Sequence, residues 1–437
     1  ENNIPRRAKV LVVGGGGREH AIVDALSRSS RVEKIYCAPG NAGIARQAKC
    51  VPLEDTQIDE LADFAGQEGI DLTVVGPEVS LAAGIVDEFE SRGLKIFGPS
   101  KAAARIESSK DFAKSLMAKY NVPTAAYRTF SDYDEALAYV NAGKLPVVLK
   151  YDGLAAGKGV VVAETLEQAD EALKDMLLDD KFGHGRVVVE EFLTGPEFSL
   201  LCFVNGSEVE PMVLAQDHKR AFDGDEGPNT GGMGAYTPLP FITEKDEVYA
   251  LEHVMKPIAS GMVSEGIPFK GVLYGGLMKT PDGIKVIEFN CRFGDPETEV
   301  VLPRLESDIF EIFWNVANDI PMPVTKWSSD AVMGFVMASK GYPGSYKKGY
   351  EITGVDEVLN DPSVRVYHMG TSLKKLGEGH ETFDKAGHSL VTNGGRVLMV
   401  LASAPDLKSA HDKALSAVEH IDCENLFHRT DIGHWAL

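Results

Sequence analysis

The sequence contains no long apolar run and no recognisable targeting segment. None of its hydrophobic stretches approaches the roughly 20 residues that are needed to span a bilayer. The N-terminal residues, from Glu1 to Arg7, lack the apolar core of a signal peptide, so we expect a short disordered leader there. These absences argue against a membrane protein and against a secreted one.

Cysteines and basic residues are also scarce. The five cysteines, Cys37, Cys50, Cys202, Cys291 and Cys423, are odd in number and widely spaced, and no two form a CxxC pair. This pattern is neither that of a disulfide framework nor that of a zinc site, and it favours a reducing cytoplasm. The formal net charge of −21 argues against nonspecific binding of nucleic acid, because phosphate backbones need a basic face. A small anionic substrate remains compatible, since lysines and arginines can gather in one cleft.

Two familiar nucleotide-binding motifs are missing as well. Only three residues separate Gly153 from Gly157, and Gly159 follows Lys158, so the spacing and the Ser or Thr of a Walker A motif are absent. Near the N-terminus, Glu19 stands where the dinucleotide fingerprint requires a third glycine, and the next strand ends without an acid for a ribose. A P-loop ATPase and a dehydrogenase are both disfavoured.

What the glycine-rich segment does contain is a loop with two cations between two β-branched runs. Gly153, Gly157 and Gly159 allow backbone N–H groups to approach an anion without obstruction by a Cβ. Lys150 and Lys158 add two ammonium groups at the same place. We therefore predict a strand–loop–strand hairpin that folds over a polyphosphate, with a hairpin that binds no ligand as the simpler alternative.

The N-terminal part alternates between strands and helices. Strands are expected at 9–13, 34–38, 72–75 and 95–97, and helices at 21–26, 58–67 and 81–92. This alternation predicts an open parallel sheet with ligand loops at one edge. Loops at Gly14–Arg18, Pro39–Gly43 and Gly76–Glu78 should converge at that edge. Because glycines at a helix N-terminus suit an anion, phosphate binding is the leading interpretation.

The middle of the chain offers a second set of candidates. We expect helices at 100–120 (a pair), 129–140 and 166–177, and a strand at 186–193. The end of that strand can present backbone groups to an adenine edge, and Glu197 can take ribose hydroxyls. Residues 214–234 are polar and glycine-rich without a helix or strand pattern, and loops of that length are usually functional or disordered. A substrate loop is the preferred interpretation and a linker the alternative.

A hairpin of residues 271–278 and 283–289 ends in three polar residues of interest. Glu288 and Asn290 alternate along one strand face and are hard oxygen donors that suit Mg²⁺. Arg292 shares that face and could hold a phosphoryl group in its planar fork. An outward polar face of an antiparallel strand is the alternative. Beyond residue 331 we expect further strands and a helix at 407–421, without an obvious catalytic residue.

A series of short motifs then occurs in one order along the chain. They are Gly-Gly-Arg-Glu-His, Pro-Gly-Asn-Ala-Gly, Gly-Pro-Glu, Lys-Tyr-Asp-Gly-Leu-Ala-Ala-Gly-Lys-Gly, Asp-His-Lys-Arg, Pro-Asn-Thr-Gly-Gly-Met-Gly and Arg-Phe-Gly-Asp-Pro-Glu. With them the chain closely resembles the glycinamide ribonucleotide synthetase family, ATP-grasp ligases of purine biosynthesis, over nearly its whole length. Cys291 and Gly275 depart slightly from the family pattern, and neither removes a polar ligand.

The resemblance implies an α/β fold in three parts. These are an N-terminal Rossmann-like substrate-binding domain (1–105), an ATP-grasp domain with mixed and antiparallel sheets (106–330), and a small C-terminal α/β domain (331–437). Residues from about 124 to 193 would form a nucleotide-clamping subdomain of the second part. We expect a monomer or weak homodimer that acts on the small molecules glycine and 5-phosphoribosylamine.

The resemblance also implies a reaction and a set of site residues. ATP would phosphorylate the carboxylate of glycine, and the amine of 5-phosphoribosylamine would attack the glycyl phosphate, giving glycinamide ribonucleotide, ADP and phosphate. The implied cofactors are ATP and Mg²⁺, with Mn²⁺ as an alternative ion held by Glu288 and Asn290. The implied ATP-binding residues are Lys110, Lys150, Gly153, Gly157, Lys158, Gly159, Glu190, Glu191, Phe192, Leu193 and Glu197. The implied substrate-binding residues are Gly15, Gly16, Gly17, Arg18, Glu19, Asn41, Gly43, Pro77, Glu78, Arg220 and Asp295, and the catalytic ones Arg292, Lys219 and Asp217.

Three alternatives stay open at this point. An ATP-grasp carboxylase, or an amino-acid ligase with another substrate, would share the nucleotide residues, and only the carboxylase would depend on bicarbonate. A dehydrogenase would need the missing third glycine. A module that only binds a nucleotide should lack Glu288, Asn290 and Arg292, and all three are present.

Overall fold

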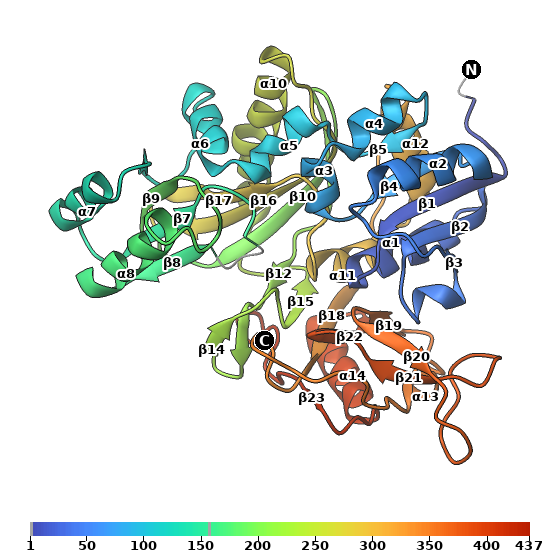
Figure 1. Cartoon of the computed structure of the whole chain (residues 1–437). Coiled ribbons are helices and arrows are strands. Elements are labelled where there is room, and N and C mark those ends of the chain that lie inside the picture. The colour runs from blue at the N-terminus through green and yellow to red at the C-terminus, as the bar shows by residue number, and fades with distance from the viewer. Residues whose placement is uncertain (1–2, 156–158) are drawn as a thin grey trace.

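The fold is that of a computed structural model of the chain, which describes residues 3–155 and 159–437. Gly157 and Lys158, two of the predicted nucleotide-loop residues, lie outside the described residues. Figure 1 shows three parts in chain order, with the blue N-terminal sheet and the green and yellow central sheets above the red C-terminal sheet. The α/β class predicted from the sequence is confirmed by the sheets and helices described below.

The N-terminal part is a five-stranded parallel sheet in the order β3-β2-β1-β4-β5. Its strands are β1 (Ala8–Gly14), β2 (Val32–Pro39), β3 (Lys49–Cys50), β4 (Leu72–Val75) and β5 (Ile96–Phe97). The helices around it are α1 (Gly17–Ser27), α2 (Ile58–Glu68), α3 (Glu78–Ala82) and α4 (Ile85–Ser91). Apart from Lys9, strand β1 is apolar, because the strands of a parallel sheet are covered on both faces. The single helix predicted at 81–92 is wrong: Gly84, with φ of 95°, ends one helix and begins another.

The central part contains an antiparallel sheet in the order β11-β10-β16-β17. Its strands are β10 (Glu197–Asn205), β11 (Glu208–Pro211), β16 (Lys270–Thr280) and β17 (Gly283–Asn290). The associated helices are α5 (Lys101–Ser108), α6 (Lys110–Lys119), α9 (Glu244–Ala250) and α10 (Lys256–Ser264), with a π-helical turn (Leu251–Met255) between the last two. The predicted pair of helices at 100–120 and the predicted β16–β17 hairpin are both confirmed.

A smaller antiparallel sheet, β6-β9-β7-β8, has a hydrophobic core of its own. Its strands are β6 (Tyr127–Phe130), β7 (Val147–Tyr151), β8 (Val160–Ala163) and β9 (Val187–Glu191), and its helices are α7 (Tyr133–Ala142) and α8 (Leu166–Leu177). The helix predicted at 129–140 begins too early, because Thr129 and Phe130 pair with β9 and Asp132 caps α7. The glycine-rich loop joins β7 to β8, as the strand–loop–strand pattern predicts.

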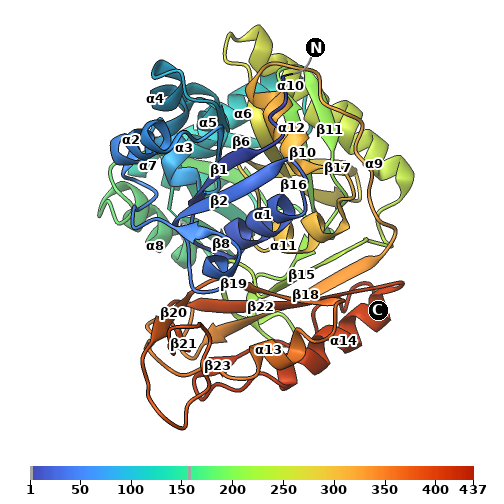
Figure 2. The ribbon, with the colours of Figure 1, turned by 90° about the vertical axis from the view of Figure 1, so that its right-hand side faces the viewer.

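The C-terminal part is built on the sheet β12-β15-β18-β22-β19, with β23 paired to β18. Its strands are β12 (Gln216–Asp217), β15 (Gly234–Thr237), β18 (Ala331–Ser339), β19 (Val364–His368), β22 (Arg396–Ala404) and β23 (Leu426–Phe427). Helix α14 (Leu407–Glu419) lies along β18 and β22, and Figure 2 shows it on the side away from the rest of the molecule. The remaining elements are the hairpins β13 (Arg220–Phe222)–β14 (Glu226–Asn229) and β20 (Thr371–Lys374)–β21 (Ser389–Thr392), the helices α11 (Glu297–Val301), α12 (Ile309–Ala317) and α13 (Val355–Val358), and 3₁₀ turns at Ile44–Arg46 and Leu302–Arg304.

The segment 214–234 therefore differs from its prediction. It was expected to lack strands, and it contains β12, β13 and β14 and leads into β15. These strands are two to four residues long, so their period is too short to recognise in the sequence. Since β12 and β15 join the C-terminal sheet, this segment connects the central and C-terminal parts.

Two further features of the chain concern membrane insertion and the state of its cysteines. In the part of the chain that the structure describes, no helix is both long and apolar enough to cross a membrane. All five cysteines lie within the described residues, and each is a free thiol.

Candidate active site

Four cations from separate segments surround Glu288, near the end of β17. Burial alone would raise the pKa of this carboxyl, but Lys219, Lys150, Lys110 and Arg292 outweigh it and lower the pKa below its usual value. Lys110 begins α6, Lys150 lies on β7, Lys219 follows β12 and Arg292 follows β17. The structure therefore brings together four predicted residues around an ionised carboxylate.

Asn290 lies two residues further along β17 and is 8% exposed. Its amide nitrogen donates to the Phe289 carbonyl at 2.9 Å, so its Oδ1 atom is left as an acceptor. In the antiparallel register Glu288 lies opposite Gly276, and Asn290 lies opposite Tyr274. Glu288 and Asn290 thus provide a carboxylate and an amide oxygen within one short stretch of strand.

A buried ion network lies behind Lys150. The Nζ atom of Lys150 is 2.9 Å from Oε2 of Glu190 and donates to the Ile287 carbonyl at 3.0 Å. Lys114 reaches the other oxygen of Glu190 at 2.8 Å, and burial lowers the pKa of Lys114. Glu190, which is predicted to line the adenine, pairs through its carboxylate with both lysines. Lys114 was not predicted as a site residue.

The described glycines of the nucleotide loop pack on Tyr151. A Cβ atom at Gly153 would lie 2.8 Å from the Tyr151 ring, and one at Gly159 would lie 2.9 Å from the Ala155 methyl group. Lys110 donates to the Gly153 carbonyl at 3.0 Å, which joins α6 to the loop. Close packing thus requires these glycines independently of any bound anion.

The strand predicted to meet the adenine ends in side chains that are open to solvent. Phe192 is 41% exposed, and Glu191 accepts a hydrogen bond from the Ala126 N–H at 3.0 Å. Leu193 is half-buried and Glu197 begins β10. Burial raises the pKa of Glu197, although Lys219 opposes the shift, so Glu197 lies beside the cluster of charges.

The loops of the N-terminal sheet meet this cluster through Glu78. Its Oε2 atom is 3.3 Å from Nε of Arg292 and 3.8 Å from Nη1 of Arg18. Arg292 is also 3.5 Å from Glu107, a residue that was not predicted. Burial would raise the pKa of Glu78, but Arg292 and Arg18 together lower it. Glu78, at the start of α3 after Pro77, thus connects the two predicted halves of the site.

Other predicted residues of these loops form hydrogen bonds and ion pairs within the loops. Glu19 forms an ion pair with Arg18 and accepts from the Gly16 N–H at 3.0 Å, which caps α1. Asn41 donates to the Gly15 carbonyl at 2.9 Å and accepts from the Gly43 N–H at 3.1 Å. These side chains position the backbone around the N-terminus of α1 rather than pointing away from the protein.

The C-terminal part packs against the same N-terminal loops. The Asn41 amide also donates to the His368 carbonyl at 2.7 Å. A Cβ atom at Gly43 would lie 2.1 Å from the His368 ring, and one at Gly17 would lie 2.9 Å from Met369. The two glycines therefore permit a close approach of the C-terminal part to the loops.

Three acidic residues follow β17 on the side of α1. Asp295 pairs with Arg396 at 3.5 Å, and burial would raise its pKa, but Arg396 and other cations lower it. Glu297 is buried, and burial together with Asp217 raises its pKa to about 8. Glu299 is buried, and among the described residues neither of its carboxyl oxygens has a hydrogen-bond partner. Burial and the nearby Asp295 carboxylate raise the pKa of Glu299 well above its usual value, so the protonated, neutral form of this carboxyl is favoured.

Glu299 gives a prediction about stability. Burial and Asp295 raise its pKa well above the ordinary value of 4.5, so the folded chain keeps a proton that the unfolded chain loses. Stability from this group is complete below that ordinary value and falls as the pH rises above it. Glu299→Gln, which needs no proton, should gain thermal stability relative to the wild type between about pH 5 and about pH 8.

Thermal unfolding at several pH values would check this expectation. Glu299→Ala is the control, because it leaves a cavity and should be destabilised at every pH. Ligation by the glutamine variant should stay close to that of the wild type. A glutamine variant that loses stability relative to the wild type as the pH rises would contradict a neutral Glu299.

The segment after β12 places two further predicted residues. Asp217 is the main cause of the raised pKa of Lys219, with Glu197 and Glu288 contributing, so these four charges lie together. Burial raises the pKa of Asp217 itself. Arg220 does not join them, because its guanidinium donates to the Gly227 carbonyl at 2.6 Å within the β13–β14 hairpin.

Sequence reasoning missed the residues that support this cluster. They are Glu107, Lys114, Glu297, Glu299 and Arg396. Glu297 belongs to the Asp-Pro-Glu motif and could have been found there. Glu107, Lys114 and Arg396 depend on contacts between elements that are distant in the sequence.

Comparisons with known proteins agree with this arrangement. Three family models match: "Phosphoribosylglycinamide synthetase, N domain" over residues 8–107, its ATP-grasp (A) domain over 108–298, and its C domain over 332–435. A phosphoribosylamine–glycine ligase of Halalkalibacterium halodurans is 50% identical over 430 residues, covering 98% of this chain and 97% of that one. One of Listeria innocua is 50% identical over 427 residues, covering 97% and 99%. The crystal structure of the Thermotoga maritima phosphoribosylamine–glycine ligase matches with a TM-score of 0.83 at 30% identity, covering 97% of this chain and 100% of that one. This chain belongs to the phosphoribosylglycinamide synthetase family, as the order of its motifs predicts.

Proposed function

We propose that this chain joins glycine to 5-phosphoribosylamine at the expense of ATP, with glycyl phosphate as the intermediate. The chain is a ligase of the ATP-grasp family, and relatives that are 50% identical to it carry the name phosphoribosylamine–glycine ligase. The observation that carries the proposal is the continuous charged cluster: Lys110, Lys150 and Lys219 around Glu288, joined through Arg292 and Glu78 to the N-terminal loops.

The nucleotide would lie between the two central sheets. Lys110 and Lys150 are close to Glu288 and would hold the phosphates, and the loop between β7 and β8 would fold over them. The exposed ring of Phe192 would face the adenine, and Glu197 would accept hydrogen bonds from the ribose hydroxyls. Glu190 supports this arrangement, because its carboxylate pairs with the ammonium group of Lys150 and fixes its position.

The donor set of β17 fits a divalent cation. Glu288 is an ionised carboxylate and Asn290 offers an amide oxygen, and hard oxygen ligands are those that Mg²⁺ and Mn²⁺ prefer. Glu288 and Asn290 would therefore hold the ion. When bound, such an ion supplies neutralisation of charge on the phosphate groups.

The residues around Lys219 suit the zwitterion of glycine. Lys219 would attract its carboxylate, and Asp217 would attract its ammonium group. The carboxylate and the terminal phosphate of ATP repel each other, so Arg292 and Lys219 lower the cost of bringing them together. The reaction needs no nucleophilic side chain, and catalysis would rest on positioning and on charge neutralisation.

The second substrate would enter from the N-terminal loops. The Gly16 N–H is bonded to Glu19, and the neighbouring backbone N–H groups of Gly15 and Gly17 at the N-terminus of α1 would favour an anion, here the phosphate of 5-phosphoribosylamine. Arg18 lies 3.8 Å from Glu78, which contacts Arg292, so the amine could reach the acyl phosphate from this side. We propose residues 1–105 as the substrate domain, 106–330 as the ATP-grasp domain and 331–437 as the C-terminal domain.

The experiment that tests the proposal is ADP release by purified protein with ATP, Mg²⁺ and glycine, with and without freshly made 5-phosphoribosylamine. We expect ADP together with glycinamide ribonucleotide only when both substrates are present. A parallel sample with bicarbonate in place of glycine tests the carboxylase alternative. ADP release that does not depend on glycine would leave the fold assignment intact and overturn glycine as the proposed substrate.

A further inference from the structure

The end of the chain contacts the segment that carries Lys219. Arg429 is fully buried and donates to the Arg220 carbonyl at 3.1 Å and to Asp225 at 2.9 Å. The backbone N–H and the hydroxyl of Thr430 both donate to Asp223 at 2.7 Å. Segment 429–434 is therefore bonded to the β13–β14 hairpin through several side chains.

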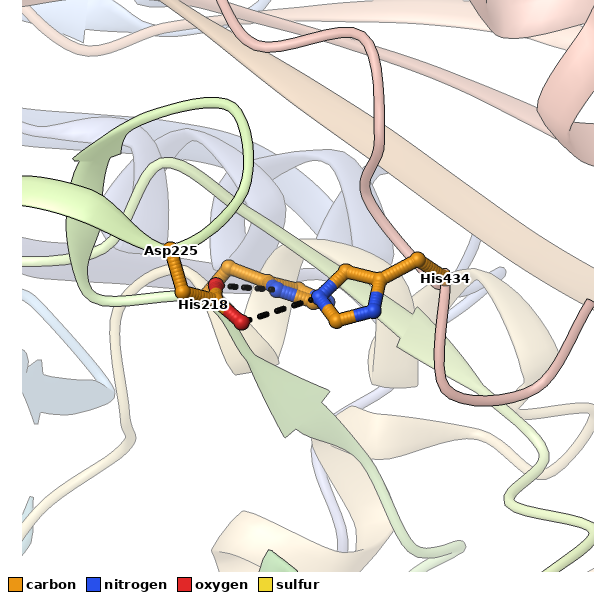
Figure 3. Close-up of side chains that lie close together, drawn as sticks. All are labelled: His218, Asp225 and His434. Atoms are coloured by element: carbon orange, nitrogen blue, oxygen red, sulfur yellow. Dashed lines mark hydrogen bonds and ion pairs between the residues drawn. The ribbon is translucent and has the colours of Figure 1, made fainter.

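Further contacts extend toward β12. The Gly433 N–H donates to Nε2 of His218 at 3.1 Å, and Asp431 accepts from the Gly224 N–H at 2.9 Å. His434 lies 3.0 Å from the Asp225 carboxylate. Figure 3 shows the side chains of His218, Asp225 and His434 turned toward one another.

The three side chains of Figure 3 are close enough to suggest a metal site, since their ligand atoms lie within 4.8 Å of one another. The hydrogen bonds argue otherwise. Because Nε2 of His218 accepts from Gly433, the neutral ring carries its proton on Nδ1, the atom that would have to bind a metal. The Asp225 carboxylate is also paired with Arg429. The cluster is a hydrogen-bonded ion network.

The direction of the side chains connects this network to the active site. Successive side chains of an extended segment point to opposite sides. Asp217 and Lys219 point to the charges around Glu288, whereas His218 is bonded to Gly433. The Lys219 carbonyl also accepts from the Thr230 N–H at 2.7 Å, so the segment is held from both sides.

We propose that residues 429–434 are a positioning element that fixes the segment 217–225, and so places Asp217 and Lys219 against glycine. Arg429 is its central positioning residue, and it acts through Asp225 and the Arg220 carbonyl. The part of this inference that concerns glycine rests on the proposed function. The part that concerns the order of the segment does not.

Arg429→Gln tests the proposal, because it removes the charge and the two-pronged contact. We expect kcat/KM for glycine to fall by about 100-fold, the effect of misplacing a catalytic group by about 1 Å, while the KM for ATP changes little. Amide hydrogen exchange of residues 217–230 should become faster. Arg92→Gln is the matched control, since Arg92 also pairs with several carboxylates but lies on the surface of the N-terminal part.

Two readouts separate the outcomes. Unchanged exchange in residues 217–230 and an unchanged kcat/KM for glycine in a folded Arg429→Gln protein would overturn the proposal. An equal increase in the KM for ATP and in the KM for glycine would also overturn the proposal, because it would indicate general damage to the fold. If wild-type protein shows no glycine-dependent ADP release, the proposed function fails, and the exchange measurement still decides whether 429–434 orders the segment.

A milder variant covers the case in which Arg429→Gln does not fold. Asp223→Asn weakens only the contact with Thr430 at the exposed end of the hairpin. It should give the same pattern with a smaller loss in kcat/KM for glycine. A folded Asp223→Asn protein with unchanged exchange in residues 217–230 and unchanged kinetics would count against the proposal.

Discussion

Replacing Arg292 by alanine should lower the rate of ligation by about 10³-fold or more while ATP still binds. Arg292 touches both halves of the proposed site, through Glu78 at 3.3 Å and Glu107 at 3.5 Å, and it also lies beside Glu288. Its charge would be needed most when the phosphoryl group passes between two anions. Binding of ATP depends mainly on Lys110 and Lys150, which the substitution leaves in place.

The measurement for Arg292 combines single-turnover ADP formation with calorimetric titration of ATP. Arg292→Lys is the matched variant, because it keeps the charge but loses the planar fork, and it should recover part of the rate. Thermal unfolding of both proteins should be recorded, since the alanine variant leaves Glu78 and Glu107 without their shared partner. Ligation at the wild-type rate in a folded alanine variant would remove Arg292 from the chemistry.

The sequence was sufficient for the parts of the fold that rest on local patterns. The strands β1, β2 and β4, the helices α2, α6 and α8 and the β16–β17 hairpin follow from apolar runs, glycines and caps that lie next to one another in the chain. The prediction from sequence failed where a single residue or a very short strand determines the local structure. Gly84 divides one predicted helix, and β12 and β13 are only 2 and 3 residues long, so no alternation of polar and apolar residues marks them in the sequence.

The residues of the candidate site also divide into those that local motifs predict and those that only long-range contacts reveal. Motifs named Lys150, Glu288 and Arg292, because a cation or a carboxylate at a strand end is visible in the sequence. Lys114, which pairs with Glu190, and Arg396, which pairs with Asp295, became visible only when the structure brought α6 next to β9 and β22 next to the loop after β17. Long-range contacts also revealed the two lysines, Lys114 and Lys150, that pair with the carboxylate of Glu190.

Glu288→Gln should weaken the apparent affinity for Mg²⁺ in the ligation reaction by at least about tenfold, which corresponds to about 1.4 kcal/mol. The substitution keeps the shape of the side chain and one oxygen donor, but it removes the negative charge, and the number of charged ligands sets the affinity of a site for a hard cation. A titration of activity against Mg²⁺ at saturating ATP and glycine measures the midpoint, and Mn²⁺ should give a shift in the same direction.

The charge balance of the cluster makes this prediction specific. Four cations lower the pKa of Glu288, so the glutamine variant keeps an excess of positive charge around the same position. ATP without a metal ion should therefore bind the variant at least as tightly as it binds the wild type, although ligation needs more Mg²⁺. Glu197→Gln is the matched control, because it removes one charge near Lys219 without removing a metal ligand, and it should leave the Mg²⁺ midpoint unchanged. An unaltered Mg²⁺ midpoint in Glu288→Gln, or equal shifts in both variants, would show that Glu288 acts as a general counter-charge and not as a ligand of the ion.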